Sequence, residues 1–259
     1  MPVDGRGRNM AVDHKVAFVT GANRGIGLAT AEELGELGIT VILGARDYGK
    51  GLVAAQNLRD VGIDAHAIEC DVTNSEHHRR VFRFLEEHFG KLDILVNNAA
   101  VQLDPASPDQ QHPNTTSSTP IELLRKTIET NFFSVVGLTQ TLLPLIRKSS
   151  SGRIVNVTSL LGSLTLLADP ESPVAPYRYF AYGTSKTALN AFTLYLADEL
   201  RGSNIKVNAA EPGWVKTEMG GSLAELDARD GAKTSAWLAT VTDDGPTGGY
   251  FHLKNTIPW

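Results

Sequence analysis

Thr20-Gly21-Ala22-Asn23-Arg24-Gly25-Ile26-Gly27 is the stretch of sequence that decides the fold. Residues 15–19 before it include Val16, Phe18 and Val19 and predict a buried strand. Residues 28–37 after it carry apolar side chains at helical spacing. Glycine lets the backbone approach a pyrophosphate closely, and the helix that follows offers free N–H groups and a positive dipole end. The spacing G-x-x-x-G-x-G differs from the general G-x-G-x-x-G fingerprint. The turn alone therefore favours a nucleotide site and an ordinary tight turn about equally.

By length alone the chain could hold one or two domains, but α/β sheets often reach this size as one unit, and the sequence shows no internal repeat or domain linker. The chain has 259 residues, of which 42% are hydrophobic and 20% charged, so it can bury a sizeable core. Residues 1–14 are polar and lack the apolar segment of a secretory signal, so we interpret them as a flexible leader before one domain over residues 15–259. No apolar run approaches the roughly 20 residues of a membrane span, which predicts a cytoplasmic protein.

The charge balance and the single cysteine exclude several classes of function. The net charge of −5, from 24 basic and 29 acidic residues, gives no support for binding nucleic acid or an anionic membrane. Cys70 cannot form an intrachain disulfide or a thiolate metal cluster, and its place after an apolar run predicts a buried structural thiol. The seven histidines show no metal-ligand spacing, so no metal site is expected. The sequence leaves a homo-oligomeric state open.

Strands and helices alternate along the chain with short connections, which predicts a doubly wound, Rossmann-type parallel sheet of about seven strands with helices on both faces. Ser75 is the expected cap of one helix, and Pro144 is expected to break a long one. Polar residues 101–119 and the stretch 160–180 interrupt the alternation. Further strands are expected at residues 40–45, 65–70, 92–96, 152–159, 205–210 and 249–252, and further helices at residues 50–61, 75–89, 120–148, 181–201 and 223–240.

Tyr182 and Lys186 form the pair most indicative of chemistry. At positions i and i+4 of an expected helix they lie on one face, a turn apart. A tyrosine with a pKa of about 10 is a poor acid–base at neutral pH, and a nearby ammonium group stabilises its phenolate. Such tuning is what a general acid needs. By itself the spacing Y-x-x-x-K is common, and an incidental pair on a solvated helix is the alternative.

In combination, the glycine turn, Asn97-Asn98-Ala99, Ser159 after the fifth strand and the Tyr182/Lys186 pair resemble the short-chain dehydrogenase/reductase family over about residues 15–251. The resemblance implies that Tyr182 is the acid–base and that Lys186 lowers its pKa. It further implies that Ser159 orients a substrate carbonyl and that Asn131 holds a water of the proton relay. Residues 131–133 and 142–146 look particularly like carbonyl-reductase members of the family.

The resemblance also implies where a dinucleotide cofactor lies. Asp71 matches the position that contacts the adenine amino group, and Pro212-Gly213-Trp214-Val215-Lys216-Thr217 matches a segment that holds the nicotinamide amide. Ala100 departs from the family pattern, which usually has glycine there. The expected cofactor-binding residues are Gly21, Asn23, Arg24, Gly25, Ile26, Gly27, Arg46, Asp71, Val72, Asn98, Ala99, Tyr182, Lys186, Pro212, Gly213, Val215 and Thr217.

The end of the second strand predicts which cofactor is used. An acidic residue there would bind the ribose 2′-hydroxyl of NAD, whereas this chain has Ala45-Arg46. Arg46 and Arg24 could clamp a 2′-phosphate, which favours NADPH. Asp47 follows directly, and we expect it to point away.

The sequence thus predicts an NADPH-dependent carbonyl reductase whose catalytic residues are Asn131, Ser159, Tyr182 and Lys186. Apolar residues near them, including Leu160, Leu161 and Trp214, predict a pocket for an uncharged, moderately bulky ketone, keto ester or aldehyde. One alternative is an NAD-dependent alcohol dehydrogenase that acts mainly in the oxidative direction. Another is a cofactor-sensing regulator or scaffold without turnover, although such proteins typically lose the tyrosine or the lysine.

Overall fold

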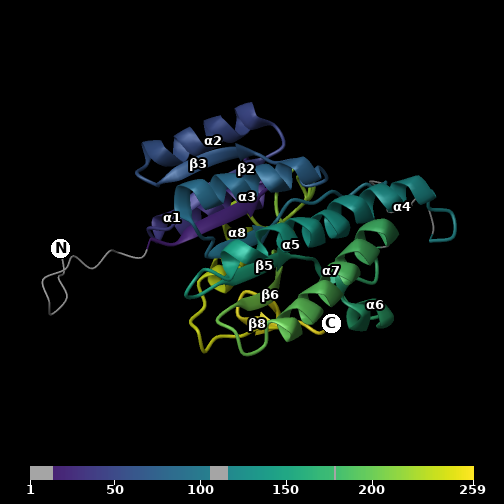
Figure 1. Cartoon of the computed structure of the whole chain (residues 1–259). Helices are drawn as coiled ribbons and strands as arrows, with labels where there is room; N and C mark the ends of the chain where they lie inside the picture. Colours follow the sequence, from purple (N-terminus) through teal and green to yellow (C-terminus); the bar gives the residue numbers. More distant parts are fainter. Residues whose placement is uncertain (1–13, 106–115, 178) are drawn as a thin grey trace, which may run out of the picture.

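Eight strands form one sheet in the order β3-β2-β1-β4-β5-β6-β7-β8 (Figure 1). The computed structural model describes residues 14–105, 116–177 and 179–259, so nearly all of the expected leader lies outside the described residues. The first seven strands pair in parallel, and β8 is antiparallel to β7. The strands are β1 Val16–Thr20, β2 Thr40–Ala45, β3 Ala65–Glu69, β4 Ile94–Asn97, β5 Arg153–Val157, β6 Lys206–Glu211, β7 Tyr250–His252 and β8 Asn255–Thr256.

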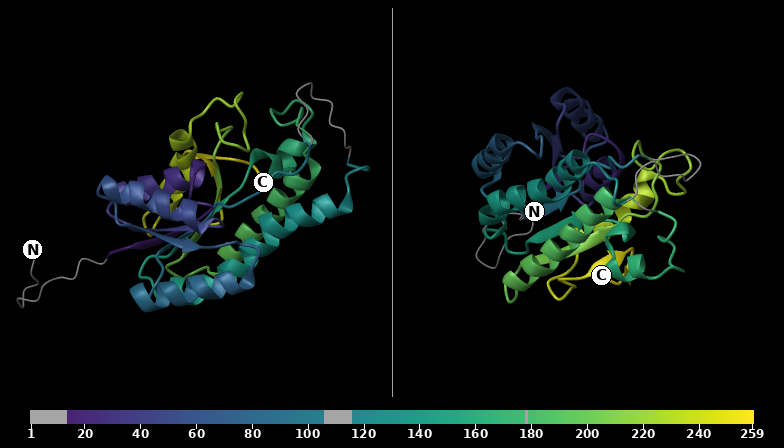
Figure 2. Two further views of the ribbon diagram at one scale, coloured as in Figure 1. Left: turned by 90° about the horizontal axis from the view of Figure 1, so that it is seen from above. Right: turned by 90° about the vertical axis from the view of Figure 1, so that its right-hand side faces the viewer.

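Helices lie on both sides of this sheet, as the two further views in Figure 2 make visible. They are α1 Gly25–Glu36, α2 Tyr48–Asp60, α3 Ser75–Phe89, α4 Ile121–Ile128, α5 Ser134–Ile146, α6 Leu164–Ala168, α7 Phe180–Glu199 and α8 Ala228–Ala239, with a π-helical turn η1 at Glu129–Phe133 and a 3₁₀ turn η2 at Leu160–Gly162. Within the described ranges, no helix is both long enough and apolar enough to cross a membrane.

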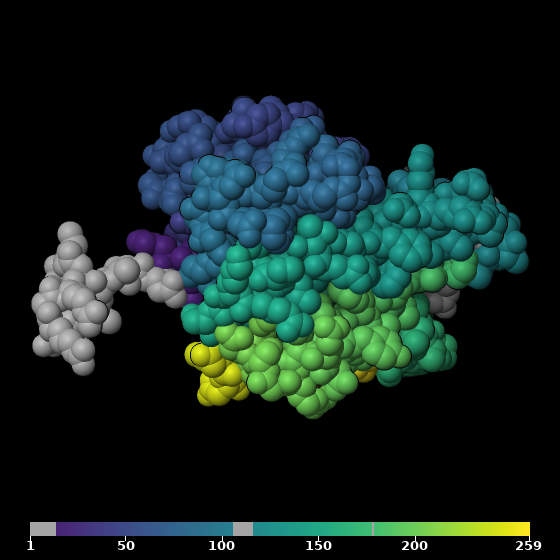
Figure 3. Space-filling model, viewed as in Figure 1, coloured from purple at the N-terminus to yellow at the C-terminus, as the bar shows by residue number. Residues whose placement is uncertain are grey.

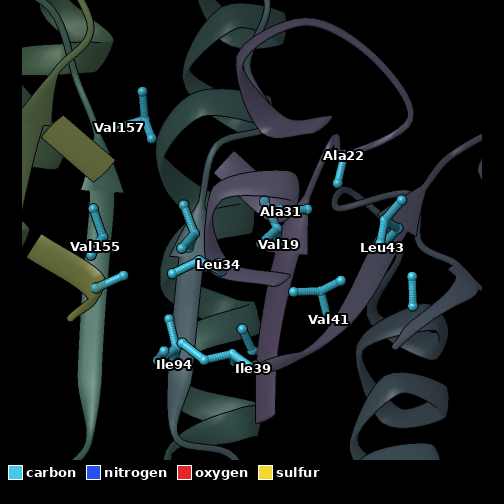
Figure 4. Packing of buried hydrophobic residues seen from close by; sticks show 14 of the residues in the cluster. Val19, Ala22, Ala31, Leu34, Ile39, Val41, Leu43, Ile94, Val155 and Val157 are labelled. Carbon is cyan, nitrogen blue, oxygen red and sulfur yellow. The ribbon is translucent and has the colours of Figure 1, made fainter. Parts of the chain in front are cut away.

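Alternation along the strands divides the core into two layers. Ala17 and Val19 of β1 face one side, where they join buried residues of α1, α2 and α8. Figure 4 shows residues of this layer, with Ala31 of α1 beside Val19 of β1. Val16 and Phe18 face the other side and join α3, α5 and α7. The prediction of a doubly wound parallel sheet is therefore confirmed.

The strand order separates the two halves of the chain in space. In the sheet, β1 to β4 lie on one side and β5 to β8 on the other, and on the face seen in Figure 3 residues up to about β4 lie above the later ones. Because the central strands are parallel, the segments that leave β1, β4, β5 and β6 all emerge at one edge of the sheet. Every residue of the candidate site lies along or near that edge.

Several details differ from the sequence prediction. The sheet has eight strands rather than about seven, because Leu253, with a φ of 53°, turns the chain back to form the two-residue β8. Pro144 lies inside α5 and does not break it, since the helix continues only to Ile146 and the missing N–H removes a single bond near its end. Asn74, not Ser75, caps α3 by accepting from the N–H of Glu76.

Candidate active site

The glycine turn lies where β1 passes into α1. Gly21 and Gly25 have φ values of 64° and 57°, which glycine adopts without strain. A Cβ atom on Gly27 would lie 2.6 Å from the carbonyl oxygen of Gly21, so the turn has no room for a side chain there. Helix α1 has no side-chain cap and no acidic residue in its first turn. Its N-terminal N–H groups therefore remain available to an anion such as a pyrophosphate.

Thr20 joins this turn to the end of β4. Its hydroxyl accepts from the N–H groups of Asn98 and Ala99, at 3.0 Å each, and the Asn98 side-chain amide donates to the Thr20 carbonyl at 2.8 Å. A Cβ on Gly21 would be only 3.1 Å from the Cα of Ala99. The structure thus places the expected ribose-binding residues directly beside the glycine turn.

The segment after β6 approaches the same turn from the other side. Thr217 lies against Gly25, where a Cβ would be 3.3 Å from the threonine methyl group. Arg24 forms an exposed ion pair with Glu218. Gly213 has a φ of 81°, which explains why glycine follows Pro212.

Arg46 and Asp71 lie close together at the ends of β2 and β3. Burial raises the pKa of Asp71, but hydrogen bonds from Thr73 and the positive charge of Arg46 outweigh it and lower the pKa overall. Asp47 caps α2 by accepting from the N–H of Lys50 at 3.1 Å. Its carboxylate is therefore used within α2, while the exposed Arg46 remains available to an anion.

Ser159, Tyr182 and Lys186 come together at this edge of the sheet. Ser159 immediately follows the buried Thr158 beyond β5 and hydrogen-bonds to the phenol of Tyr182. Tyr182 lies in the first turn of α7, and the Lys186 Nζ atom lies 5.5 Å from the centre of its ring. Lys186 is buried and donates to the carbonyl oxygen of Val157 at 2.8 Å.

The electrostatics of this group keep the tyrosine protonated. Burial raises the pKa of Tyr182 above its usual value, and the Glu211 carboxylate raises it further, while the hydrogen bond from Ser159 opposes the rise. Burial lowers the pKa of Lys186 to about 8, although Glu211 opposes that shift. Lys186 was expected to lower the pKa of Tyr182, but in the protein without cofactor the effect of burial is larger and the pKa is raised. At neutral pH the phenol therefore carries its proton and can donate it.

Asn131 lies in the π-helical turn η1 between α4 and α5. Its amide nitrogen donates to the Val101 carbonyl at 2.8 Å and to the Ser185 hydroxyl at 3.0 Å, and its oxygen accepts from the Val101 N–H at 2.8 Å. Both of its N–H groups are thus used to join the loop after β4 to α7. A water of the expected relay would have to bind to its oxygen or to the backbone.

Asp104 is a part of the site that the sequence analysis missed. Its buried carboxylate accepts from the N–H groups of Ala181 and Tyr182, at 2.9 Å each. Helix α7 has no cap from its own preceding residue, Tyr179. The N-terminus that carries Tyr182 is therefore capped by a residue of the loop after β4. Nothing in the sequence distinguishes this aspartate from the other polar residues of the loop.

Glu211 is the second missed residue, at the last position of β6. It is buried, and its Oε2 atom accepts from the N–H of Gly213 at 3.0 Å. An acidic residue at the end of a predicted buried strand, directly before Pro212-Gly213, was a signal that could have found it.

Aromatic side chains gather around the expected substrate pocket. Tyr177 stacks on Tyr179 with ring centres 6.5 Å apart and meets Trp214 edge-on at the same separation. The indole N–H of Trp214 donates to the Gly220 carbonyl, which fixes the ring at the surface, where 45% of the residue is exposed. Leu160 and Leu161, in η2 beside Ser159, are half-buried.

A doubly wound sheet with a glycine turn and a Ser–Tyr–Lys group at its carboxyl edge defines a Rossmann-type α/β protein. Comparison with known families identifies it further, because residues 15–227 match the model of the short chain dehydrogenase family. The chain belongs to that family, and its resemblance to it is confirmed.

Individual relatives match nearly the whole chain. Carbonyl reductase (NADPH) 1 of Mus musculus is 32% identical over 290 residues, covering 96% of this chain and 100% of the mouse protein. The short-chain dehydrogenase anuI of Penicillium roqueforti is 36% identical over 236 residues, covering 89% of this chain and 90% of that protein. Salutaridine reductase from Papaver somniferum has a similar structure, with a TM-score of 0.78 at 29% identity over 92% of this chain and 99% of that chain.

Proposed function

We propose that the protein is a cytoplasmic, NADPH-dependent carbonyl reductase that acts on uncharged ketones, keto esters or aldehydes. The observation that carries the proposal is the group formed by Ser159, Tyr182 and the buried Lys186, in which the raised pKa of the phenol keeps it protonated. A protonated phenol at this point can act as the proton donor that reduction of a carbonyl needs. Carbonyl reductase (NADPH) 1 of Mus musculus supports the same class of reaction and the same cofactor.

The residues at the edge of the sheet fit a dinucleotide. The uncapped N-terminus of α1 and the absence of a side chain at Gly27 suit a pyrophosphate. Asn98 and Ala99, beside the glycine turn, would hold the ribose. Arg46 and Arg24 supply guanidinium groups for a 2′-phosphate, with Arg24 exchanging its partner Glu218 for the phosphate. When bound, NADPH supplies the hydride.

The protein itself supplies the proton and the orientation of the substrate. Tyr182 donates its proton to the carbonyl oxygen, and the Ser159 hydroxyl, already hydrogen-bonded to that phenol, holds the same oxygen. The charge of Lys186 stabilises the phenolate that remains, since the ammonium lies near the ring. Asn131 keeps the loop after β4 in place against α7.

The surroundings of the site favour an uncharged substrate. Tyr177, Tyr179 and Trp214 offer aromatic surfaces, and Leu160 and Leu161 add apolar ones. Arg178 and Lys216 are the two cations of the surrounding segments that could anchor an acidic substrate. Lys216 is exposed, and Arg178 lies outside the described residues. Free keto acids and sugar phosphates should accordingly be poor substrates.

The experiment is to follow NADPH absorbance with purified protein and a panel of aryl ketones, keto esters, aldehydes and keto acids. We expect turnover with the uncharged members and little with the keto acids. Tyr182→Phe is the matched control, since it removes only the hydroxyl. It should lower kcat by roughly 10²-fold or more while NADPH still binds. Faster turnover with NAD and alcohols would favour the alternative dehydrogenase, and cofactor binding without any turnover would favour the regulator.

A further inference from the structure

Glu211 is a buried carboxylate that none of the proposed steps uses. Only 5% of the residue is exposed. Besides the bond from Gly213 at 3.0 Å, the carboxylate accepts a backbone hydrogen bond from Leu160. It therefore touches both segments that surround the reacting group: the one after β6, and the one that begins at Ser159.

Glu211 also lies among the ionisable groups of the site. The Lys186 ammonium binds the Val157 carbonyl of β5, and Val157 pairs with Ala210, so Glu211 is the next residue along the neighbouring strand. Lys186 and Tyr182 face it from α7, and Tyr250 and His252 face it from β7.

The contacts of this carboxyl group fit its ionised form. Burial raises the pKa of Glu211, while the Gly213 N–H, the charges on His252 and Lys186 and the Leu160 N–H offset part of that rise. The two backbone groups are donors, so they need an acceptor opposite them, whereas a protonated carboxyl would need an acceptor of its own. Each nearby positive charge also lowers the cost of burying a negative one.

We propose that Glu211 is a positioning residue of the reduction proposed above, on which this inference rests: it ties the Pro212-Gly213 segment to the segment after Ser159, and its negative charge acts on the Lys186 ammonium from the strand beside Val157. In this arrangement the carboxylate keeps the ammonium charged and disfavours loss of the Tyr182 proton. Its influence reaches the substrate and the cofactor only through those groups.

The first test is the pH dependence of NADPH binding, measured by cofactor fluorescence with Glu211→Gln. Since burial lowers the pKa of Lys186 to about 8, NADPH should dissociate more readily as the pH rises through that value in the unmodified protein. Removing the carboxylate lowers the pKa of Lys186 further. We expect the midpoint of the binding profile to move to lower pH by about one unit. A midpoint that stays in place would overturn the proposal.

Asp93→Asn is the matched control. Asp93 is likewise a buried carboxylate that accepts from a backbone N–H, that of Val16 at 2.8 Å, and it lies 3.1 Å from a lysine, Lys91. It lies at the opposite edge of the sheet, before β4. Its loss should lower the thermal stability while leaving the pH profile of NADPH binding unchanged. An equal pH shift in this control would show that Glu211 has no special position.

A second measurement needs no cofactor and so separates this inference from the proposed function. Thermal unfolding is measured for Glu211→Gln, Lys186→Met and the double variant. An electrostatic interaction between the two buried groups predicts coupling, so that the double variant loses less stability than the two single losses added together. The same comparison serves if Glu211→Gln does not fold, since the double variant should then recover the folded state. Additive losses, or a double variant that is no better folded, would overturn the proposal even if NADPH binds.

Discussion

Replacing Asp104 with alanine should loosen the N-terminus of α7 and so affect catalysis at a distance. The change removes the acceptor for the N–H groups of Ala181 and Tyr182, two hydrogen bonds of 2.9 Å to a buried carboxylate. Each hydrogen bond to a charged group contributes about 1.5–3 kcal/mol, and relief from burying the charge offsets part of the sum. We estimate a loss of about 3 kcal/mol, which for a chain of this length lowers Tm by roughly 6–12 °C.

The assay combines urea unfolding with steady-state kinetics. Because α7 begins two residues before Tyr182, we expect kcat to fall while the KM for NADPH changes little. Asp227→Ala is the control, since Asp227 caps α8 through one bond from Asp230 N–H at 2.8 Å and is exposed. That variant should lose about 1 kcal/mol and keep its kcat. If Asp104→Ala costs no more than the control and retains full kcat, the reasoning is refuted.

Three further outcomes follow from the same geometry. Arg46→Asp should reverse the preference for NADPH over NADH, and equal efficiency with both cofactors in the unmodified protein would contradict the role of this arginine. Gly27→Ala should destabilise the protein by about 1–3 kcal/mol and weaken cofactor binding, because the new Cβ would lie 2.6 Å from a backbone oxygen; an unchanged Tm would contradict this. Trp214→Ala should lower kcat/KM for an aryl ketone roughly tenfold but not for a small aldehyde, and equal effects on both would argue against an aromatic contact.

The fold was predictable because its signals are local. Strand and helix alternate with short connections, and residues 40–45 were predicted with the bounds that β2 has in the structure. The errors occur where a contact between residues distant in the sequence determines the local structure. The long helical segment is interrupted at η1 rather than at Pro144, and Asn131 within η1 bonds to Val101 and Ser185, which lie 30 and 54 residues away in the sequence. The helical spacing of apolar residues cannot predict hydrogen bonds to residues so distant in the sequence.

The candidate site divides in the same way. Tyr182 and Lys186 are one helical turn apart and could be paired from sequence alone. Asp104 acts on α7 across 77 residues, and Glu211 meets Lys186 only because β5 and β6 are neighbours in the sheet. The direction in which the pKa of Tyr182 is shifted could not be predicted from the motif either, because it depends on the burial of the phenol in the folded protein.

The central place of β1 in the sheet also has a consequence for how the protein folds. One edge of β1 pairs with β2, where Ala17 lies opposite Val41. The other edge pairs with β4, where the partner of Ala17 is Ile94, so that edge stays unpaired until a much later part of the chain is in place. Until then a strand of mostly apolar residues, all of which are buried in the finished fold, has an unpaired edge, which is a template for pairing with another chain. Parallel pairing over such a separation is slow, since loop closure has to precede the contacts that stabilise it. Refolding from denaturant should therefore lose material to aggregation as protein concentration rises, and a chain cut before Ile94 should aggregate rather than form a soluble half-domain.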